Sequence, residues 1–162
     1  MGIFINYEGI KGESADAGHK DWVDVKNWQW GGERQITSAT STQGDRESSN
    51  AVIRDLRISK YMDSSSPKFF IEFCCGTGKD VTLHLTKTGT GSGADVYMEY
   101  KLKNALISAY NVHGSEYDTH RPTEKITISF VDIEVKYTPY DEDGNAMAPV
   151  AVGFNTATNT KR

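Results

Sequence analysis

The chain has 162 residues, of which 37% are hydrophobic and 10% aromatic, and this length predicts a single domain over residues 1–162. Its 18 basic and 22 acidic residues give a formal net charge of −4, so there is no electrostatic reason to expect nucleic acid or an anionic membrane as a partner. No apolar run approaches the roughly 20 residues that a membrane-spanning helix needs, so we expect no membrane insertion.

The N-terminal stretch MGIFINYEGIKGES carries no signal for secretion. It has neither a basic n-region nor an uninterrupted apolar h-region. The two cysteines, Cys74 and Cys75, are adjacent and cannot form the spaced framework of a secreted disulfide scaffold. We therefore expect a chain made in the cytosol, whose export would need no signal peptide.

Alternating apolar residues predict short β-strands along most of the chain. The alternation is found at residues 3–7, 23–25, 52–58, 81–85 and 96–102. Clusters rich in Gly, Ser and Asp separate these runs and have the composition of turns. The chain is therefore predicted to be mainly β.

Two predicted strands change the face on which their apolar residues lie. The apolar phase shifts near Asn27 within residues 21–32, and again between Phe130 and Val131 within residues 124–137. A flat strand buried on one face cannot accommodate such a shift, so we predict a bend or bulge at each point. Long bent strands favour a closed or nearly closed β-barrel of two sheets.

The tryptophans of the first bent segment give two alternatives. Trp28 and Trp30 share one face of a strand, and such pairs more often fill a core, which would leave Gln29 pointing outward. In the other alternative both indoles are exposed and form an aromatic platform of a monomeric β-sandwich that binds a ligand.

Residues 37–50 are almost wholly polar and show no sustained period. They predict a long surface loop. Long loops in compact domains usually either bind a partner or are disordered, and both alternatives stay open.

The segment SSSPKFFIEFCCG predicts one amphipathic helix packed against the sheets. A serine as N-cap acceptor, Pro67 in the first turn and Gly76 as the stop are helix signals. The residues at helical spacing that we expect on its apolar face are Phe69, Phe70, Phe73 and Cys74.

The run CCGTGK, within this helix end and the loop after it, does not predict a phosphate site or a redox centre. A phosphate cradle needs a strand, a Gly loop and then a helix N-terminus, whereas here the helix comes first. A bridge between neighbouring cysteines would be strained, and no histidine lies at metal-ligand spacing from them. We expect Cys74 to pack as a small hydrophobe and Cys75 to end the helix, which leaves a thiol enzyme as the weakest alternative.

Two other candidate sites are interpreted as structural. His84 alternates onto the face opposite Leu83 and Leu85, so we expect it on a polar sheet surface and not as a general base. The run DEDGN at 141–145 is similar to a calcium loop, but Pro139 stands where the first carboxylate is required, so it predicts a turn. We predict no metal, no cofactor and no catalytic residue.

Several stretches together resemble the Hcp (haemolysin co-regulated protein) family of bacterial type VI secretion systems. They span nearly the whole chain and are KGES, GHKDWVDVKNWQWG, RDLRISKYMDSSSPKFF, ALISAYNVHGS and RPTEKITISFVDIEVKYTPYDEDG. The resemblance implies a two-sheet β-barrel with one helix, assembled as a homohexamer whose rings stack into a tube. Contraction of a surrounding sheath would propel this tube and its spike into a target cell, and effector proteins could be held in the lumen.

The resemblance also implies roles for particular residues. The region that reaches a neighbouring ring in the family corresponds to the polar loop, so the expected stacking contacts are Ser38, Thr40, Gln43, Arg46 and Glu47. Gln29 corresponds to the lumen-facing side and is the expected cargo contact, the alternative being ordinary solvated surface. Since the sequence ends at Arg162, we expect neither the toxin domain that some members carry nor enzymatic activity.

Overall fold

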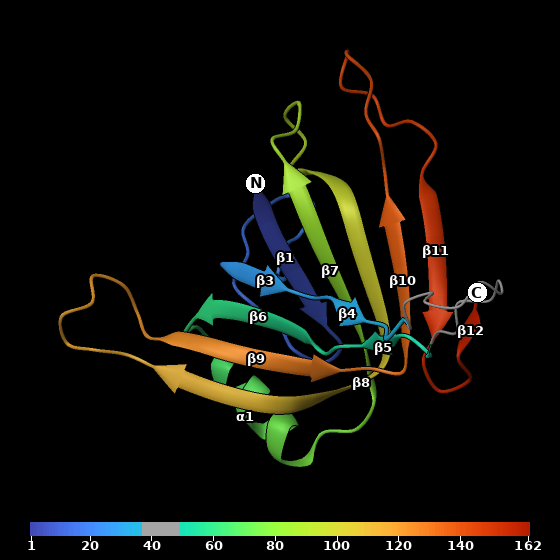
Figure 1. The fold of residues 1–162 in the computed structure, drawn as a ribbon. Helices are drawn as coiled ribbons and strands as arrows, with labels where there is room; N and C mark the ends of the chain where they lie inside the picture. Colours follow the sequence, from blue (N-terminus) through green and yellow to red (C-terminus); the bar gives the residue numbers. More distant parts are fainter. Residues whose placement is uncertain (37–48) are drawn as a thin grey trace, which may run out of the picture.

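The computed structural model describes residues 1–36 and 49–162, and this part of the chain is mainly β with a single helix (Figure 1). In chain order its elements are β1 (Gly2–Tyr7), β2 (Val23–Asp24), β3 (Asn27–Gln29), β4 (Gly32–Glu33), β5 (Val52–Ile53), β6 (Leu56–Tyr61), α1 (Ser66–Cys75), β7 (Lys79–Lys87), β8 (Asp95–His113), β9 (Thr123–Ser129), β10 (Asp132–Tyr137), β11 (Val150–Asn155) and β12 (Thr160–Lys161).

The strands form two layers that share β8. One layer has the order β12-β11-β10-β8-β7-β1-β2, and the other joins β3, β6, β9 and the second half of β8. β8 turns from one layer into the other near Asn104, whose φ is 53°. Figure 1 shows the two layers crossing at a steep angle. α1 packs on the inward face of the second layer, where Ser66 contacts the buried Lys60 and Glu124.

Both predicted bends are confirmed. Between Asp24 and Asn27 the chain leaves its pairing with β1 and begins its pairing with β6. Between Ser129 and Asp132 it moves from β6 and the end of β8 to the start of β8 and β11. Each apolar phase shift therefore marks a change of sheet.

The predicted closed barrel is not confirmed. β2 and β3 are separate short strands, and the pairing that the structure describes forms open sheets and no closed ladder. The physical reason is the bend itself, because residues 25 and 26 each donate one backbone hydrogen bond, to Ile3 and Ser59 respectively, instead of continuing a strand.

The core lies between the two layers. Its completely buried side chains include Ile5, Tyr7, Leu83, Ile126 and Ile128, which the period-two pattern places on inward faces. Burial raises the pKa of the Tyr7 hydroxyl to about 12, and the nearby Glu72 carboxylate acts in the same direction.

The helix begins and ends as predicted, with Pro67 in its first turn and Gly76 as its C-cap. The expected serine cap is wrong in detail. Ser65 occupies the N-cap position, but its hydroxyl makes no capping bond and donates instead to Asp63. Within the described ranges no helix is long and apolar enough to cross a membrane.

Candidate functional site

The outer face of the second layer is concave. A hollow of about 480 Å³ lies over β3, β6, β9 and the end of β8. The strand registers align its outward side chains in two rows, Gln29–Arg57–Thr127–Ala109 and Asn27–Ser59–Lys125–Asn111. This face therefore presents amides, hydroxyls and cations, with no large apolar side chain in either row.

The two tryptophans point the other way. Trp28 and Trp30 are partly buried against the core, and the centroids of their rings lie 5.2 Å and 5.5 Å from that of Tyr100. Gln29, between them, is exposed and lines the hollow. The packing supports the core interpretation of the tryptophans and opposes an exposed aromatic platform.

A buried charged cluster lies between α1 and the second layer. The Lys60 ammonium is completely buried and lies 2.8 Å from a carboxylate oxygen of Glu124 and 2.9 Å from one of Asp63. The Ser66 and Tyr110 hydroxyls donate to the Glu124 carboxylate. The cluster joins the first turn of α1 to β6, β8 and β9.

Burial and charge shift the pKa values in this cluster. Burial alone would raise the pKa of Asp63, but the hydrogen bonds from Ser65 and Lys60 outweigh it and lower the pKa below its ordinary value. Burial raises the pKa of Tyr110, and its hydrogen bond to Glu124 adds to the rise. The Tyr110 hydroxyl therefore stays protonated at neutral pH and can donate to Glu124.

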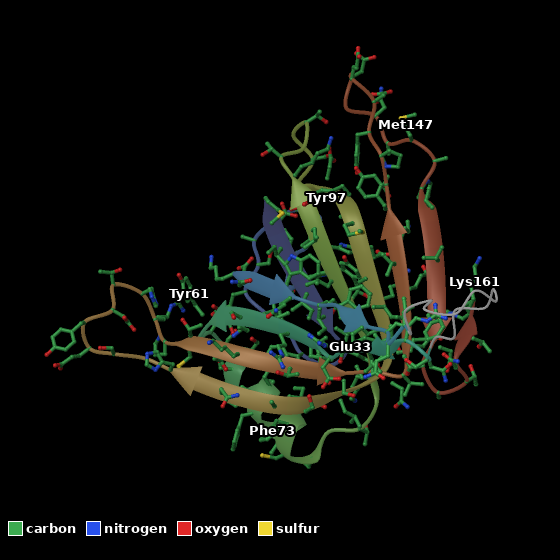
Figure 2. The ribbon with its side chains drawn as sticks, viewed as in Figure 1. Glu33, Tyr61, Phe73, Tyr97, Met147 and Lys161 are labelled. Atoms are coloured by element: carbon green, nitrogen blue, oxygen red, sulfur yellow. The ribbon has the colours of Figure 1, made fainter. Side chains whose placement is uncertain are left out.

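Two apolar patches are exposed on different sides of the molecule. The helix patch consists of Phe70, Ile71 and Phe73, which are 52%, 50% and 41% exposed. The strand patch consists of Val150 and Val152 on β11, which are 67% and 53% exposed. Figure 2 shows Phe73 projecting from α1 at one end of the molecule, far from Met147 in the loop that leads to β11. Exposed apolar side chains gathered in this way are typical of protein contact surfaces.

The helix patch corrects the expectation for the cysteines. Phe69 is the fully buried apolar residue of α1, whereas Cys74 and Cys75 are both exposed free thiols. Helical spacing predicted one buried face made of Phe69, Phe70, Phe73 and Cys74, and the last three of these are exposed. An apolar helix face can also serve to contact another protein. Cys75 ends the helix, as expected.

The expectation for His84 also needs correction. It does lie opposite the two leucines, but its side chain is only 14% exposed because the loop carrying His19 and Trp22 covers it. It is hydrogen-bonded to His19 at 2.8 Å and to Glu99 at 2.6 Å. Sequence reasoning missed His19, whose only signal is the GHKDW stretch.

The remaining candidates are placed as follows. Residues 141–145 form a turn in which the Asp141 carboxylate accepts from the backbone N–H groups of Asp143 and Asn145. Among the described residues, no group of three or more His, Cys, Asp or Glu side chains could hold a metal ion. The expected stacking contacts Ser38, Thr40, Gln43, Arg46 and Glu47 lie outside the described residues.

Comparison with known proteins agrees with this fold. Residues 4–137 match the family model described as "Type VI secretion system effector, Hcp". The chain is 31% identical over 163 aligned residues to Protein hcp1 of Pseudomonas aeruginosa, covering 98% of this chain and 97% of that protein.

Solved structures agree over the full length. A type six secretion system protein superposes with a TM-score of 0.90 at 27% identity, covering 99% of both chains. Hcp1 from Salmonella typhimurium superposes with a TM-score of 0.75 at 22% identity, covering 99% of this chain and 98% of that one, and supports the fold alone. With its bent shared strand, its docked helix and its match to the family model over residues 4–137, the chain belongs to the Hcp family of type VI secretion system proteins.

Proposed function

We propose that this chain is a structural tube subunit that forms homohexameric rings, stacks these rings into a tube, and is exported with the spike from the bacterial cytoplasm without a signal peptide. Membership of the Hcp family supports the assignment of this chain to a type VI secretion system. The observation that carries the assembly is the presence of two different apolar patches on one chain.

A ring of identical subunits requires a heterologous contact, in which one patch of a protomer meets a different patch of the next. The helix patch and the strand patch meet this requirement because they differ in residues and lie on separate sides of the fold (Figure 1). Exposure of the apolar side chains of either patch to water is unfavourable. We assign them to the two sides of the ring contact.

The concave face is the natural lining of such a ring. It is polar, so it can remain in water after the ring closes, and Gln29 lies on it as a contact for effector proteins. The polar loop would supply the contacts between rings through Ser38, Thr40, Gln43, Arg46 and Glu47. The sheath and spike would meet the outside and the end of the stack.

Assembly gives the direct test of this function. Light scattering after gel filtration is expected to give a mass roughly six times the 18.0 kDa of one chain. Ile71→Glu on the helix patch and Val150→Glu on the strand patch should each shift the protein toward the monomer, because an apolar contact cannot solvate a carboxylate.

Lys20→Glu is the control, because Lys20 is exposed and belongs to neither patch. It introduces the same glutamate and should leave the mass unchanged. A wild-type protein that remains a single chain at high concentration would contradict the proposed function. Rings that survive both patch variants would contradict the assignment of the patches.

A further inference from the structure

The concave face carries an unbalanced positive charge. Arg57 and Lys125 are exposed and line the hollow, and among residues 1–36 and 49–162 no carboxylate does. Neither cation has an ion-pair partner among the residues that the structure describes. The chain as a whole carries a net charge of −4, so this face has the opposite sign to the molecule.

The neighbouring surface carries both signs of charge. A second hollow of about 360 Å³ adjoins the first, and Arg54, Asp55 and Arg57 all line it. Arg54 is paired there with Glu33 at 3.1 Å. Arg54, next to the concave face, is therefore compensated, whereas no ion pair of Arg57 or Lys125 is found among the described residues.

We propose that the concave face binds the acidic, polar surface of a partner protein, a role that specifies the chemistry of the cargo and rests on the proposed function. Unpaired cations attract carboxylates, and the amides and hydroxyls around them can accept or donate hydrogen bonds to the same surface. Six copies around a ring would repeat this pattern and add many weak contacts together. The absence of a large apolar side chain from the two rows argues against an apolar peptide or a small hydrophobic ligand.

The test uses a fluorescein-labelled polyglutamate peptide as the probe, with a polylysine peptide and single-stranded DNA of equal charge number for comparison. Wild-type protein should bind polyglutamate in low salt and lose it as salt is added. Arg57→Glu combined with Lys125→Glu should weaken that binding by about tenfold or more. Lys20→Glu combined with Lys103→Glu changes the net charge equally at exposed positions outside the hollow and should leave binding near the wild-type value.

The outcomes separate the two proposals. Mass is measured on every variant, so a protein that forms rings but binds polyglutamate no better than polylysine overturns the inference alone. A protein that stays monomeric overturns the proposed function, and its polyglutamate binding still decides the chemistry of the face. Tighter binding of DNA than of polyglutamate would assign the face to nucleic acid and overturn an acidic protein partner.

A second and independent inference concerns four titratable side chains that lie in a row over β1, β7 and β8. Asp16 contacts His19 at 2.7 Å, His19 contacts His84 at 2.8 Å, and His84 contacts Glu99 at 2.6 Å. His19 is 2% exposed and stacks on Phe4 with ring centroids 4.4 Å apart. The centre of this row of side chains is therefore shielded from water.

These three hydrogen bonds require three protons. A neutral imidazole carries one N–H, so two neutral rings between two ionised carboxylates supply only two. With each ring donating to its carboxylate, the facing nitrogens of His19 and His84 would both be acceptors at 2.8 Å. One further proton between the rings makes all three contacts hydrogen bonds.

The surroundings indicate where this proton lies. The hydrogen bond from His19 lowers the pKa of Asp16. Burial would raise the pKa of Glu99, but the hydrogen bond and charge of His84 outweigh it and lower that pKa, with Lys101 and Lys136 adding to the decrease. Burial is also the largest influence on His84 and lowers its pKa, against the opposing effect of Glu99. Both carboxylates thus favour the ionised form, so the additional proton lies on the two rings and not on a carboxylate.

We infer that the two rings share one additional proton between the ionised carboxylates of Asp16 and Glu99, and that loss of this proton breaks the contact between the rings. Asp16 also accepts from the backbone N–H of Ala94, at 3.1 Å. The contacts of His19 with His84 and of Asp16 with Ala94 therefore fix the loop of residues 8–22 to β7 and to the turn between β7 and β8. Loss of the shared proton is expected to loosen this loop.

Nitrogen NMR of the imidazole rings tests the inference. In the wild-type protein three of the four ring nitrogens of His19 and His84 should be protonated, with the exposed His113 as an internal reference. Two neutral tautomers on His19 and His84 would overturn it, and this measurement needs no variant. In His84→Gln the amide can donate to His19, so the shared proton should be lost, whereas a His19 ring still protonated on both nitrogens would overturn the sharing.

Discussion

Replacement of Lys60 by methionine is expected to lower the free energy of unfolding by about 3 to 5 kcal/mol. The substitution removes the ammonium that lies 2.8 Å from Glu124 and 2.9 Å from Asp63, and both Lys60 and Glu124 are completely buried. Glu124 would then be a buried carboxylate with only the Ser66 and Tyr110 hydroxyls as partners. Urea unfolding followed by tryptophan fluorescence measures the loss.

The double variant Lys60→Met with Glu124→Leu is the matched control. Removing both charges leaves no unpaired ion, so the double variant should be more stable than the single one. All proteins are compared at equal concentration, because assembly adds to the apparent stability of a subunit. A single variant that loses less than about 1 kcal/mol would show that the ion pair does not stabilise the fold in this way.

Phe69→Ala is the second substitution with a large expected effect, a loss of about 3 to 5 kcal/mol. Phe69 is completely buried, its ring packs edge-on against Tyr7 with centroids 5.7 Å apart, and the Lys60 ammonium lies 5.7 Å from its centroid. It is the main apolar contact through which α1 docks on the sheets. Thermal unfolding followed by circular dichroism should show a clearly lower midpoint.

Phe70→Ala provides a control on the same helix with the same chemical change. Phe70 is 52% exposed, so its truncation should change the stability of the protomer by much less than that of Phe69. Under the proposed function it should weaken the ring instead. Equal destabilisation by the two substitutions would contradict the assignment of Phe69 as the buried anchor.

The strands and the helix could be predicted because their signals are local. Alternation placed Ile3, Ile5 and Tyr7 on one inward face, and the structure buries all three. Pro67 and Gly76 bracketed the helix for reasons that depend only on the nearest residues. The phase shifts even located the points at which the chain changes sheet.

The buried polar contacts could not be assembled from the sequence because their partners are far apart in the chain. His19 and His84 are separated by 65 residues, and Lys60 and Glu124 by 64. One signal was available, since Lys60 lies in phase with the buried Leu56 and Ile58. A charged residue on an inward face predicts a buried counter-ion.

The exposed helix patch shows a different limit. Helical spacing predicts that Phe69, Phe70 and Phe73 contribute to an apolar part of the helix surface. It does not predict whether each side chain packs on the core of its own chain or on another chain. The distinction depends on what covers the helix, and the spacing within one chain contains no information on this point.

β8 has a mechanical consequence. Because one continuous backbone of 19 residues belongs to both layers, sliding one layer past the other would have to stretch covalent bonds and break rows of hydrogen bonds. Side-chain packing alone would yield to such a load much sooner. A subunit tied together in this way would transmit an axial thrust through its peptide chain and keep its shape while doing so.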